Sequence, residues 1–233
     1  MNLKKRCILF LMMDLLVAGI LYTQIRAEHR EENRNQNVMA AANIKESDRK
    51  GRICLTFDDG PSPVYTKQLL DGLAERGVVA TFFVTGKNVD LYPKIIKRMQ
   101  DEGHLIGNHT YHHTQLTAVN ADSFETEITR TNASIRKVTG EETIFIRPPY
   151  GSWDKKYEKK LNMFPVLWTI DPLDWCSTDA DCVARKVVTK VRENDIILLH
   201  DCYDSSVKAA FLIVDELKKQ GYEFVTVDEI LFD

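Results

Sequence analysis

Two adjacent carboxylates, Asp58 and Asp59, end an apolar run directly before a Gly60-Pro61 turn. The run at residues 52–57 predicts a strand, so the two acids stand where that strand meets solvent. Acids at such a place must be solvated, paired or bound to a metal, because burying a lone carboxylate is costly. We therefore expect Asp58 and Asp59 to form one end of a metal-dependent hydrolase site.

The N-terminal residues 1–23 have the pattern of an exported protein. Lys4-Lys5-Arg6 precede an apolar run from residue 7 to about residue 22, which only Asp14 interrupts. A basic start followed by such a run predicts an export signal or a membrane anchor. We expect an uncleaved signal-anchor in the cell membrane with the following chain outside, and secretion after cleavage is the alternative.

Residues 24–50 are polar and charge-dense, which predicts a linker before a domain at 51–233. The whole chain has 233 residues and a formal charge of −3, so bulk electrostatics give no reason to expect a nucleic-acid partner. No CxxC pair occurs, which disfavours a cysteine zinc site. Export permits disulfides, and we expect one bridge among Cys176, Cys182 and Cys202 and a free buried thiol at Cys54.

From residue 52 onward, short apolar runs alternate with amphipathic stretches. Strands are expected at 52–57, 78–84, 104–108, 143–146, 166–170, 195–199 and 223–227, and helices at 64–76, 93–102, 123–138, 154–162, 179–192 and 207–220. This alternation predicts βαβ units and a parallel sheet buried on both faces. Periodicity allows an open sheet or a barrel, but polar groups follow five different strands, which favours a barrel. About 180 residues are too few for a full eight-stranded barrel, so we expect a shortened one.

His109 and His113 have the i, i+4 spacing that places two side chains on one side of a helical turn, a common arrangement of metal ligands. Together with Asp59 they give two histidines and one carboxylate, a set typical of catalytic zinc sites that keep one position open for water. His112 cannot face the same way, so we expect it to support the site or to be structural. His104, on the preceding strand, is expected to be structural.

Five motifs occur in one order along the chain. They are Thr56-Phe57-Asp58-Asp59-Gly60, His109-Thr110-Tyr111-His112-His113, Arg147-Pro148-Pro149-Tyr150-Gly151, Asp171-Pro172-Leu173-Asp174-Trp175 and Ile197-Leu198-Leu199-His200. With these motifs the chain resembles the polysaccharide deacetylases of carbohydrate esterase family 4, the NodB-homology domain, from about residue 52 to residue 227. The resemblance implies an α/β fold, a distorted or incomplete (β/α) barrel of about seven parallel strands, and deacetylation of N-acetylated sugars.

Carried over to this chain, the resemblance implies that Asp59, His109 and His113 hold a divalent metal. The expected ion is Zn²⁺, with Co²⁺ or Mn²⁺ as alternatives. Asp58 would be the general base toward the attacking water. His200 would be the general acid that protonates the departing amine.

The remaining motif residues would support these groups. Arg147 would hold Asp58 ionised, since a nearby cation favours a charged carboxylate. Asp171 would pair with His200 and favour its protonated form, and we prefer it to Asp174 for that role.

Four further residues, Tyr150, Trp175, Leu198 and Asp174, would contact the substrate. Trp175 and Leu198 would form the wall of the pocket for the acetyl methyl group. The backbone N–H of Tyr150 would help to stabilise the tetrahedral oxyanion.

The expected substrate follows from the resemblance and the predicted anchor together. A deacetylase outside a bacterium-like membrane would act on N-acetylglucosamine units of peptidoglycan, and chitin oligomers, exopolysaccharide or acetyl-xylan are the alternatives. A non-catalytic glycan-binding module on the same fold should have lost a ligand or an acid, and this chain has lost neither. We expect a monomer.

Overall fold

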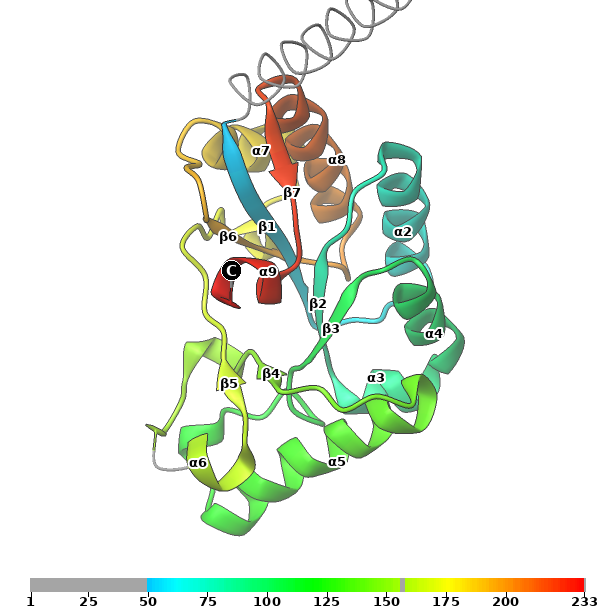
Figure 1. Ribbon diagram of the computed structural model, residues 1–233, viewed down its shortest axis with the longest axis vertical. Coiled ribbons are helices and arrows are strands. Elements are labelled where there is room, and N and C mark those ends of the chain that lie inside the picture. The colour runs from blue at the N-terminus through cyan, green and yellow to red at the C-terminus, as the bar shows by residue number, and fades with distance from the viewer. Residues whose placement is uncertain (1–49, 156–157, 233) are drawn as a thin grey trace, which may run out of the picture. The chain divides into compact units, whose positions relative to one another are not determined.

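Residues 50–155 and 158–232 are described by the computed structural model (Figure 1). The signal-anchor predicted at 1–23 and the linker predicted at 24–50 therefore lie outside the described residues, except for Lys50. None of the helices in the described part of the chain combines the length and apolar character needed to cross a membrane.

The sheet contains parallel strands in the order β5-β4-β3-β2-β1-β6, and β7 pairs with the first half of β1. The strands are β1 (Gly51–Asp58), β2 (Thr81–Val84), β3 (Leu105–Asn108), β4 (Phe145–Ile146), β5 (Phe164–Pro165), β6 (Ile196–His200) and β7 (Tyr222–Phe224). Within the described residues, a single bridge between Ile170 and Ile197 links the β5 side of the sheet to β6. The barrel is therefore incomplete, which confirms the predicted incomplete barrel of about seven parallel strands.

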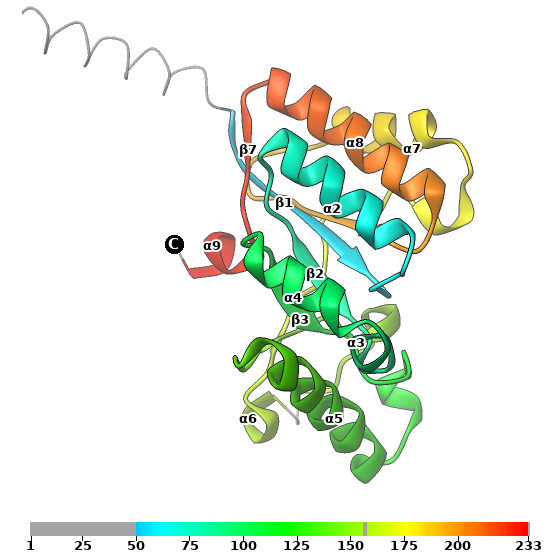
Figure 2. The ribbon, with the colours of Figure 1, turned by 90° about the vertical axis from the view of Figure 1, so that its right-hand side faces the viewer.

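Helices surround this sheet, most of them on its outer face, while the last helix packs at its inner face. They are α2 (Tyr65–Arg76), α3 (Gly86–Leu91), α4 (Pro93–Asp101), α5 (Ala121–Thr139), α6 (Glu158–Leu161), α7 (Ala180–Val188), α8 (Asp204–Lys219) and α9 (Val227–Phe232), with short 3₁₀ turns η1 (Leu116–Ala118), η2 (Pro149–Gly151) and η4 (Asp174–Cys176). Figure 2 shows α7, α8, α2 and α4 following one another along the outer face. Helix α2 ends at Gly77 and α5 at Gly140, directly after the predicted helix at 64–76 and close to the predicted end of the helix at 123–138, and both glycines adopt left-handed conformations without strain.

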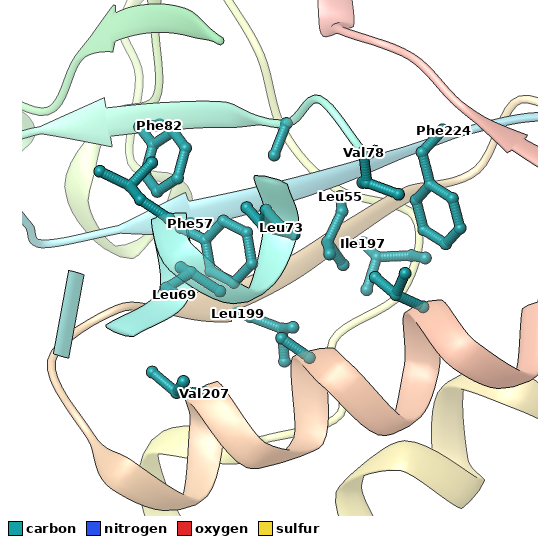
Figure 3. Packing of buried hydrophobic residues seen from close by; sticks show 14 of the residues in the cluster. Leu55, Phe57, Leu69, Leu73, Val78, Phe82, Ile197, Leu199, Val207 and Phe224 are labelled. Carbon is teal, nitrogen blue, oxygen red and sulfur yellow. The ribbon is translucent and has the colours of Figure 1, made fainter. Parts of the chain in front are cut away.

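The side chains of β1 alternate between two environments. Ile53, Leu55 and Phe57 belong to the main core beneath the helices, where Figure 3 shows Leu55 beside Ile197, its partner on β6. The intervening residues Cys54, Thr56 and Asp58 point to the other face, because successive strand residues alternate. The same alternation directs Leu198 and His200 of β6 inward, since Ile197 and Leu199 lie in the main core. Strand periodicity therefore brings polar groups of two neighbouring strands to the inner face.

A second apolar cluster occupies that inner face, and it consists of Cys54, Phe83, Phe145, Val166, Ile196 and Val227. Val227 is the first residue of α9, and its backbone N–H donates to Thr81 Oγ1 at 3.1 Å. The sequence predicted a strand through residue 227 and no helix after it. Instead, β7 ends at Phe224 and the chain turns to pack α9 against the sheet (Figure 1).

The strand predicted at 166–170 was wrong. The paired residues are Phe164 and Pro165, and Pro165 is tolerated because β5 is an edge strand that needs no N–H there. After β5, the carbonyls of Val166 and Leu167 accept hydrogen bonds from Arg147 at 3.1 and 3.2 Å instead of pairing with a strand. A buried cation thus takes the place of a strand neighbour.

Two helix starts also differ from expectation. The short helix α3 at Gly86–Leu91 was not predicted. Helix α5 begins after Asn120, whose side chain accepts from the N–H of Ser123 at 2.9 Å, and so starts at Ala121 instead of the predicted residue 123. Asparagine is an equally good N-cap, and the apolar pattern alone does not distinguish neighbouring caps.

Candidate active site

Asp58, the last residue of β1, is held by a buried arginine. Its side chain is 5% exposed, and its Oδ1 lies 2.9 Å from Nη1 of Arg147, which is fully buried. The same nitrogen donates to Thr56 Oγ1 at 2.6 Å. Since a buried guanidinium is stable only with its charge paired and its donors satisfied, Arg147 and Asp58 depend on each other. The predicted contact between Arg147 and Asp58 is confirmed.

Asp59 leaves the strand direction and faces two histidines. Its φ of 76° is in the left-handed region, which turns its side chain toward the same side as Asp58. Asp59 Oδ1 lies 3.3 Å from His109 Nε2 and 3.2 Å from His113 Nε2. Although burial favours its protonated form, His109 and then His113 lower the pKa of Asp59. Asn88 fixes the turn by donating to the Asp59 carbonyl at 2.9 Å.

These three residues have the donor set and orientation that a divalent cation requires. Asp59 Oδ1 is buried and accepts no hydrogen bond from any described residue. His109 Nδ1 lies 2.6 Å from the Arg147 carbonyl, which can only accept, so that nitrogen carries the proton and Nε2 presents its lone pair. The ligand atoms of Asp59, His109 and His113 all lie within 4.8 Å of one another, so the residues present fit a metal ion.

The predicted helical turn between the two histidines was wrong. Residues 109–113 form an irregular loop, with Thr110 at φ 63° and His113 at φ 58°. The imidazole rings nevertheless approach to 5.0 Å between centroids. Two left-handed residues therefore produce the proximity that the i, i+4 spacing suggested, by a different backbone path.

Glu127 of α5 holds this loop from behind. Its Oε2 accepts the backbone N–H groups of Tyr111 and His112 at 2.9 and 2.8 Å, and its Oε1 lies 2.7 Å from His112 Nδ1. His112 therefore supports the loop and is directed away from the metal ligands, as expected. His104 lies elsewhere: its Nδ1 accepts from Ala80 N–H at 3.1 Å, and burial lowers its pKa to about 4, in keeping with a structural role.

His200 pairs with Asp174, which corrects the preference for Asp171. Asp174 is 1% exposed, and its Oδ1 lies 2.9 Å from His200 Nδ1. Asp171 instead accepts the N–H of Leu173 at 2.8 Å. Leu173, at φ 60°, reverses the chain and turns the next residue inward, a bend that the sequence does not reveal. Burial opposes protonation of His200, but the hydrogen bond and charge of Asp174 raise its pKa to about 9.

A cavity of about 370 Å³ joins these groups. It is lined by Asp58, Asp59, His109, His113, Tyr150, Trp168, Asp171, Trp175, Leu198, His200 and Tyr203. The structure thus places the predicted Tyr150, Trp175 and Leu198 at the cavity. Tyr150 is 70% exposed and Trp175 is 56% exposed, so their rings form a rim that can stack against a sugar.

Two lining residues, Trp168 and Tyr203, were missed by the sequence analysis. Both belong to segments that follow strand ends, Trp168 after β5 and Tyr203 after β6. Aromatic residues just beyond parallel strands are a usable signal, because sites form at those ends. Because a strand was predicted at 166–170, Trp168 was expected within the sheet and not beyond a strand end.

Asp201 is a further buried acid that the sequence analysis did not single out. It is 1% exposed and accepts from Thr66 Oγ1 at 2.5 Å, while Thr66 in turn accepts the N–H of Ser62 at 2.6 Å. A Cβ at Gly60 would lie 2.2 Å from Asp201 Oδ2, so only glycine fits there. Burial raises the pKa of Asp201 to about 7, and Asp59 adds to this effect.

The expected disulfide is absent from the described residues. Cys176, Cys182 and Cys202 are free thiols, which contradicts the predicted bridge among them. Cys54 is a free buried thiol, as expected, and burial raises its pKa to about 12.

Comparison with known proteins supports the family resemblance inferred from the five motifs. The family model described as polysaccharide deacetylase matches residues 45–166, just over half of the chain. A peptidoglycan-N-acetylglucosamine deacetylase of Bacillus cereus is 38% identical over 185 residues, which cover 76% of this chain and 67% of that protein. The peptidoglycan-N-acetylmuramic acid deacetylase PdaC of Bacillus subtilis is 38% identical over 178 residues, which cover 76% of this chain but 38% of PdaC. The chain therefore matches well under half the length of that relative.

Solved structures give the same grouping. The structure of PdaC from Bacillus subtilis has a TM-score of 0.76 at 37% identity and covers 78% of this chain and 91% of that chain. A family 4 acetyl xylan esterase from Clostridium thermocellum, in complex with a cobalt ion, has a TM-score of 0.72 at 38% identity, covering 76% of this chain and 89% of that chain. The chain therefore belongs to the polysaccharide deacetylase family, the hydrolytic deacetylases of carbohydrate esterase family 4.

Proposed function

We propose that this protein is a metal-dependent deacetylase that removes N-acetyl groups from N-acetylglucosamine units of peptidoglycan. The observation that carries the proposal is that two ion pairs lie next to each other on adjacent strands. Asp58, bound to Arg147, and His200, bound to Asp174, are register partners on β1 and β6. A base and an acid therefore stand side by side next to the three metal ligands.

The base and the acid have distinct protonation partners. Arg147 occupies Oδ1 of Asp58, while Oδ2 lies 3.8 Å from His109 Nε2, beside the metal ligands. Asp58 Oδ2 accepts a proton from the water that attacks the acetamide carbon. A divalent cation bound by Asp59, His109 and His113 would act as a Lewis acid on the carbonyl and the water.

His200 completes the reaction at the leaving nitrogen. Its Nδ1 is bound to Asp174, so Nε2 is the atom that can donate. The raised pKa of about 9 keeps His200 protonated near neutral pH, as a general acid requires. Breaking the C–N bond with protonation of nitrogen gives acetate and a free amine on the sugar.

The metal ion is proposed from the chemistry of its ligands, and the polymer is proposed from similarity to known deacetylases. Two imidazoles and one carboxylate suit zinc, and cobalt or manganese are the other candidates. Peptidoglycan is proposed because the B. cereus and B. subtilis relatives carry that substrate in their names. The Tyr150 N–H is proposed as the oxyanion donor, and Trp175 and Leu198 as the walls of the acetyl pocket.

We further propose that the enzyme acts outside the cell as a monomer, tethered to the membrane by residues 1–23. The proposal rests on the basic and apolar pattern of that segment. Secretion after cleavage is the alternative, and mass measurement of the mature chain distinguishes the two.

The decisive experiment measures acetate release by the full chain, stripped of metal and reloaded with Zn²⁺, Co²⁺ or Mn²⁺. The substrates are purified peptidoglycan, chitotetraose and acetyl-xylan, and the sugar that gains an amine is identified in the peptidoglycan product. Release that needs metal and leaves glucosamine supports the proposal. Activity that survives chelation or Asp59→Ala, or an amine found on muramic acid, contradicts it.

A further inference from the structure

A second cavity of about 330 Å³ adjoins the first and is lined by Asp59, Thr85, Lys87, Asn88, Tyr111, His112 and His113. Asp59 and His113 line both cavities. A glycan strand bound at the metal site continues beyond the reacting sugar, and this cavity can receive a neighbouring unit. None of the reaction steps above uses Lys87.

The acidic groups around this second cavity are already paired. Asp90 Oδ2 accepts from Tyr111 Oη at 2.7 Å, and Glu127 Oε1 lies 2.7 Å from His112 Nδ1. Asp59 faces His109 and His113, with which it forms the candidate metal site. These carboxylates therefore do not neutralise an additional cation at the cavity.

Lys87 is the cation that remains. Its side chain is exposed, and within residues 50–155 and 158–232 no carboxylate lies within ion-pair distance of its ammonium. The backbone of Lys87 is fixed, because its N–H donates to the Tyr111 carbonyl at 3.1 Å. The cavity thus combines an anchored backbone with an uncommitted positive charge that can bind an anion on the ligand.

We propose that Lys87 and this cavity bind the lactyl carboxylate of the muramic acid unit next to the N-acetylglucosamine that is deacetylated. The inference rests on the proposed function. Peptidoglycan alternates these two sugars, and the lactyl carboxylate is free on strands that have lost their peptides. Chitin and xylan carry no such acid, so Lys87 distinguishes an anionic strand from a neutral one.

Three tetrasaccharide substrates test this proposal on the metal-loaded full chain. The first alternates N-acetylglucosamine with muramic acid and has free lactyl carboxylates, the second has the same acids as methylamides, and the third is chitotetraose. For Lys87→Ala we expect kcat/KM on the first substrate to fall about two- to fivefold, the effect of one solvent-exposed ion pair. The loss should appear in KM, increase in Lys87→Glu and shrink at high salt.

Matched variants separate a charge contact from a structural effect. Lys87→Arg keeps the charge and should retain activity on the acidic substrate. Lys94→Ala, an exposed lysine of α4 outside both cavities, makes the same change in net charge and should alter nothing. The methylamide and chitotetraose should be hydrolysed equally by wild type and Lys87→Ala.

If Lys87→Ala loses activity equally on all three substrates, or loses none on the first, the inference is overturned. The proposed function would still stand in that case, because it depends on turnover by the wild type. Calorimetry can compare the affinities of wild type and Lys87→Ala for the first two oligosaccharides without relying on turnover. If wild type releases no acetate, weaker binding of the acidic strand by Lys87→Ala still supports the lysine contact, and equal binding contradicts it.

Discussion

Asp174 contacts His200 through both of its carboxylate oxygens. Oδ1 lies 2.9 Å from the ring Nδ1, and Oδ2 accepts the backbone N–H of His200 at 2.8 Å. The acid therefore fixes the position of the imidazole as well as its charge. The pKa of His200 is raised to about 9, from about 6.5 in an unfolded chain.

The first prediction concerns the alkaline limit of activity. Protonated His200 is available below about pH 9 and is lost as the pH rises through that value. Asp174→Asn removes the charge and should move the alkaline limb of the kcat profile toward the unperturbed value near pH 6.5. Asp171→Asn serves as the control and should leave the limb in place, since Asp171 bonds to Leu173. An unchanged limb in Asp174→Asn would exclude His200 as the acid whose titration limits turnover.

The same pair contributes to stability, with a definite sign. Because the folded-state pKa is raised, the contribution is complete below about pH 6.5 and disappears as the pH rises through about 9. Urea unfolding of the metal-free chain at a series of pH values should show wild type losing its advantage over Asp174→Asn in that interval. Parallel curves for the two proteins would contradict the expectation.

The second prediction separates the two adjacent acids. Asp59→Asn should weaken metal binding at least about tenfold together with activity, because it removes an anionic ligand. Asp58→Asn should keep the metal and lose turnover. Metal content after dialysis and acetate release are the two measurements. Metal loss in Asp58→Asn with retention in Asp59→Asn would mean that the two roles are reversed.

The third prediction concerns the buried arginine. Arg147→Met leaves Asp58 as an unpaired buried charge. It also removes the hydrogen bonds that Arg147 donates to oxygens of Thr56, Val166 and Leu167. It should therefore destabilise the fold by about 3–5 kcal/mol. Arg136→Met is the matched control: its partner Glu142 is at 2.6 Å, but both side chains are more than half exposed.

That exposed pair should contribute no more than about 1 kcal/mol. Urea denaturation provides both values. Equal losses in Arg147→Met and Arg136→Met would show that burial does not determine what the Arg147 ion pair contributes.

The fourth prediction uses Asp201. Its pKa is raised from 3.8 to about 7, so the fold accommodates the neutral acid and loses stability as the pH rises from about 4 through 7. The total effect is on the order of 4 kcal/mol. Asp201→Asn keeps an acceptor for Thr66 and cannot ionise, so the stability difference between it and wild type should grow in its favour across this interval. A difference that is constant with pH would contradict this expectation.

Local signals in the sequence were sufficient for much of the fold. Gly77 and Gly140 end their helices because the left-handed residue at each end suits glycine. The strand predicted at 52–57 is present, and the two acids follow it as expected, since strand geometry depends mainly on neighbouring residues. The family motifs identified the Asp58–Arg147 contact and the three ligand residues, which the structure brings within reach of one another.

Tertiary contacts determine what could not be predicted. The choice between Asp171 and Asp174 depends on the left-handed turn at Leu173, a non-glycine residue for which sequence offers no warning. The segment after Pro165 looked like a strand, but its carbonyls bond to Arg147, which lies about twenty residues earlier. The cavity position of Trp168 follows from that same interaction.

The strand that carries Asp58 is paired with strands on both sides, whereas the segment that carries Trp168 contacts the sheet through a few backbone hydrogen bonds at Val166, Thr169 and Ile170. We therefore expect amide protons of β1 to exchange with solvent more slowly than those of the segment after β5. Arg147 joins the two, because it binds the Leu167 carbonyl as well as Asp58, so local opening of that segment would also loosen the charged side of the pocket.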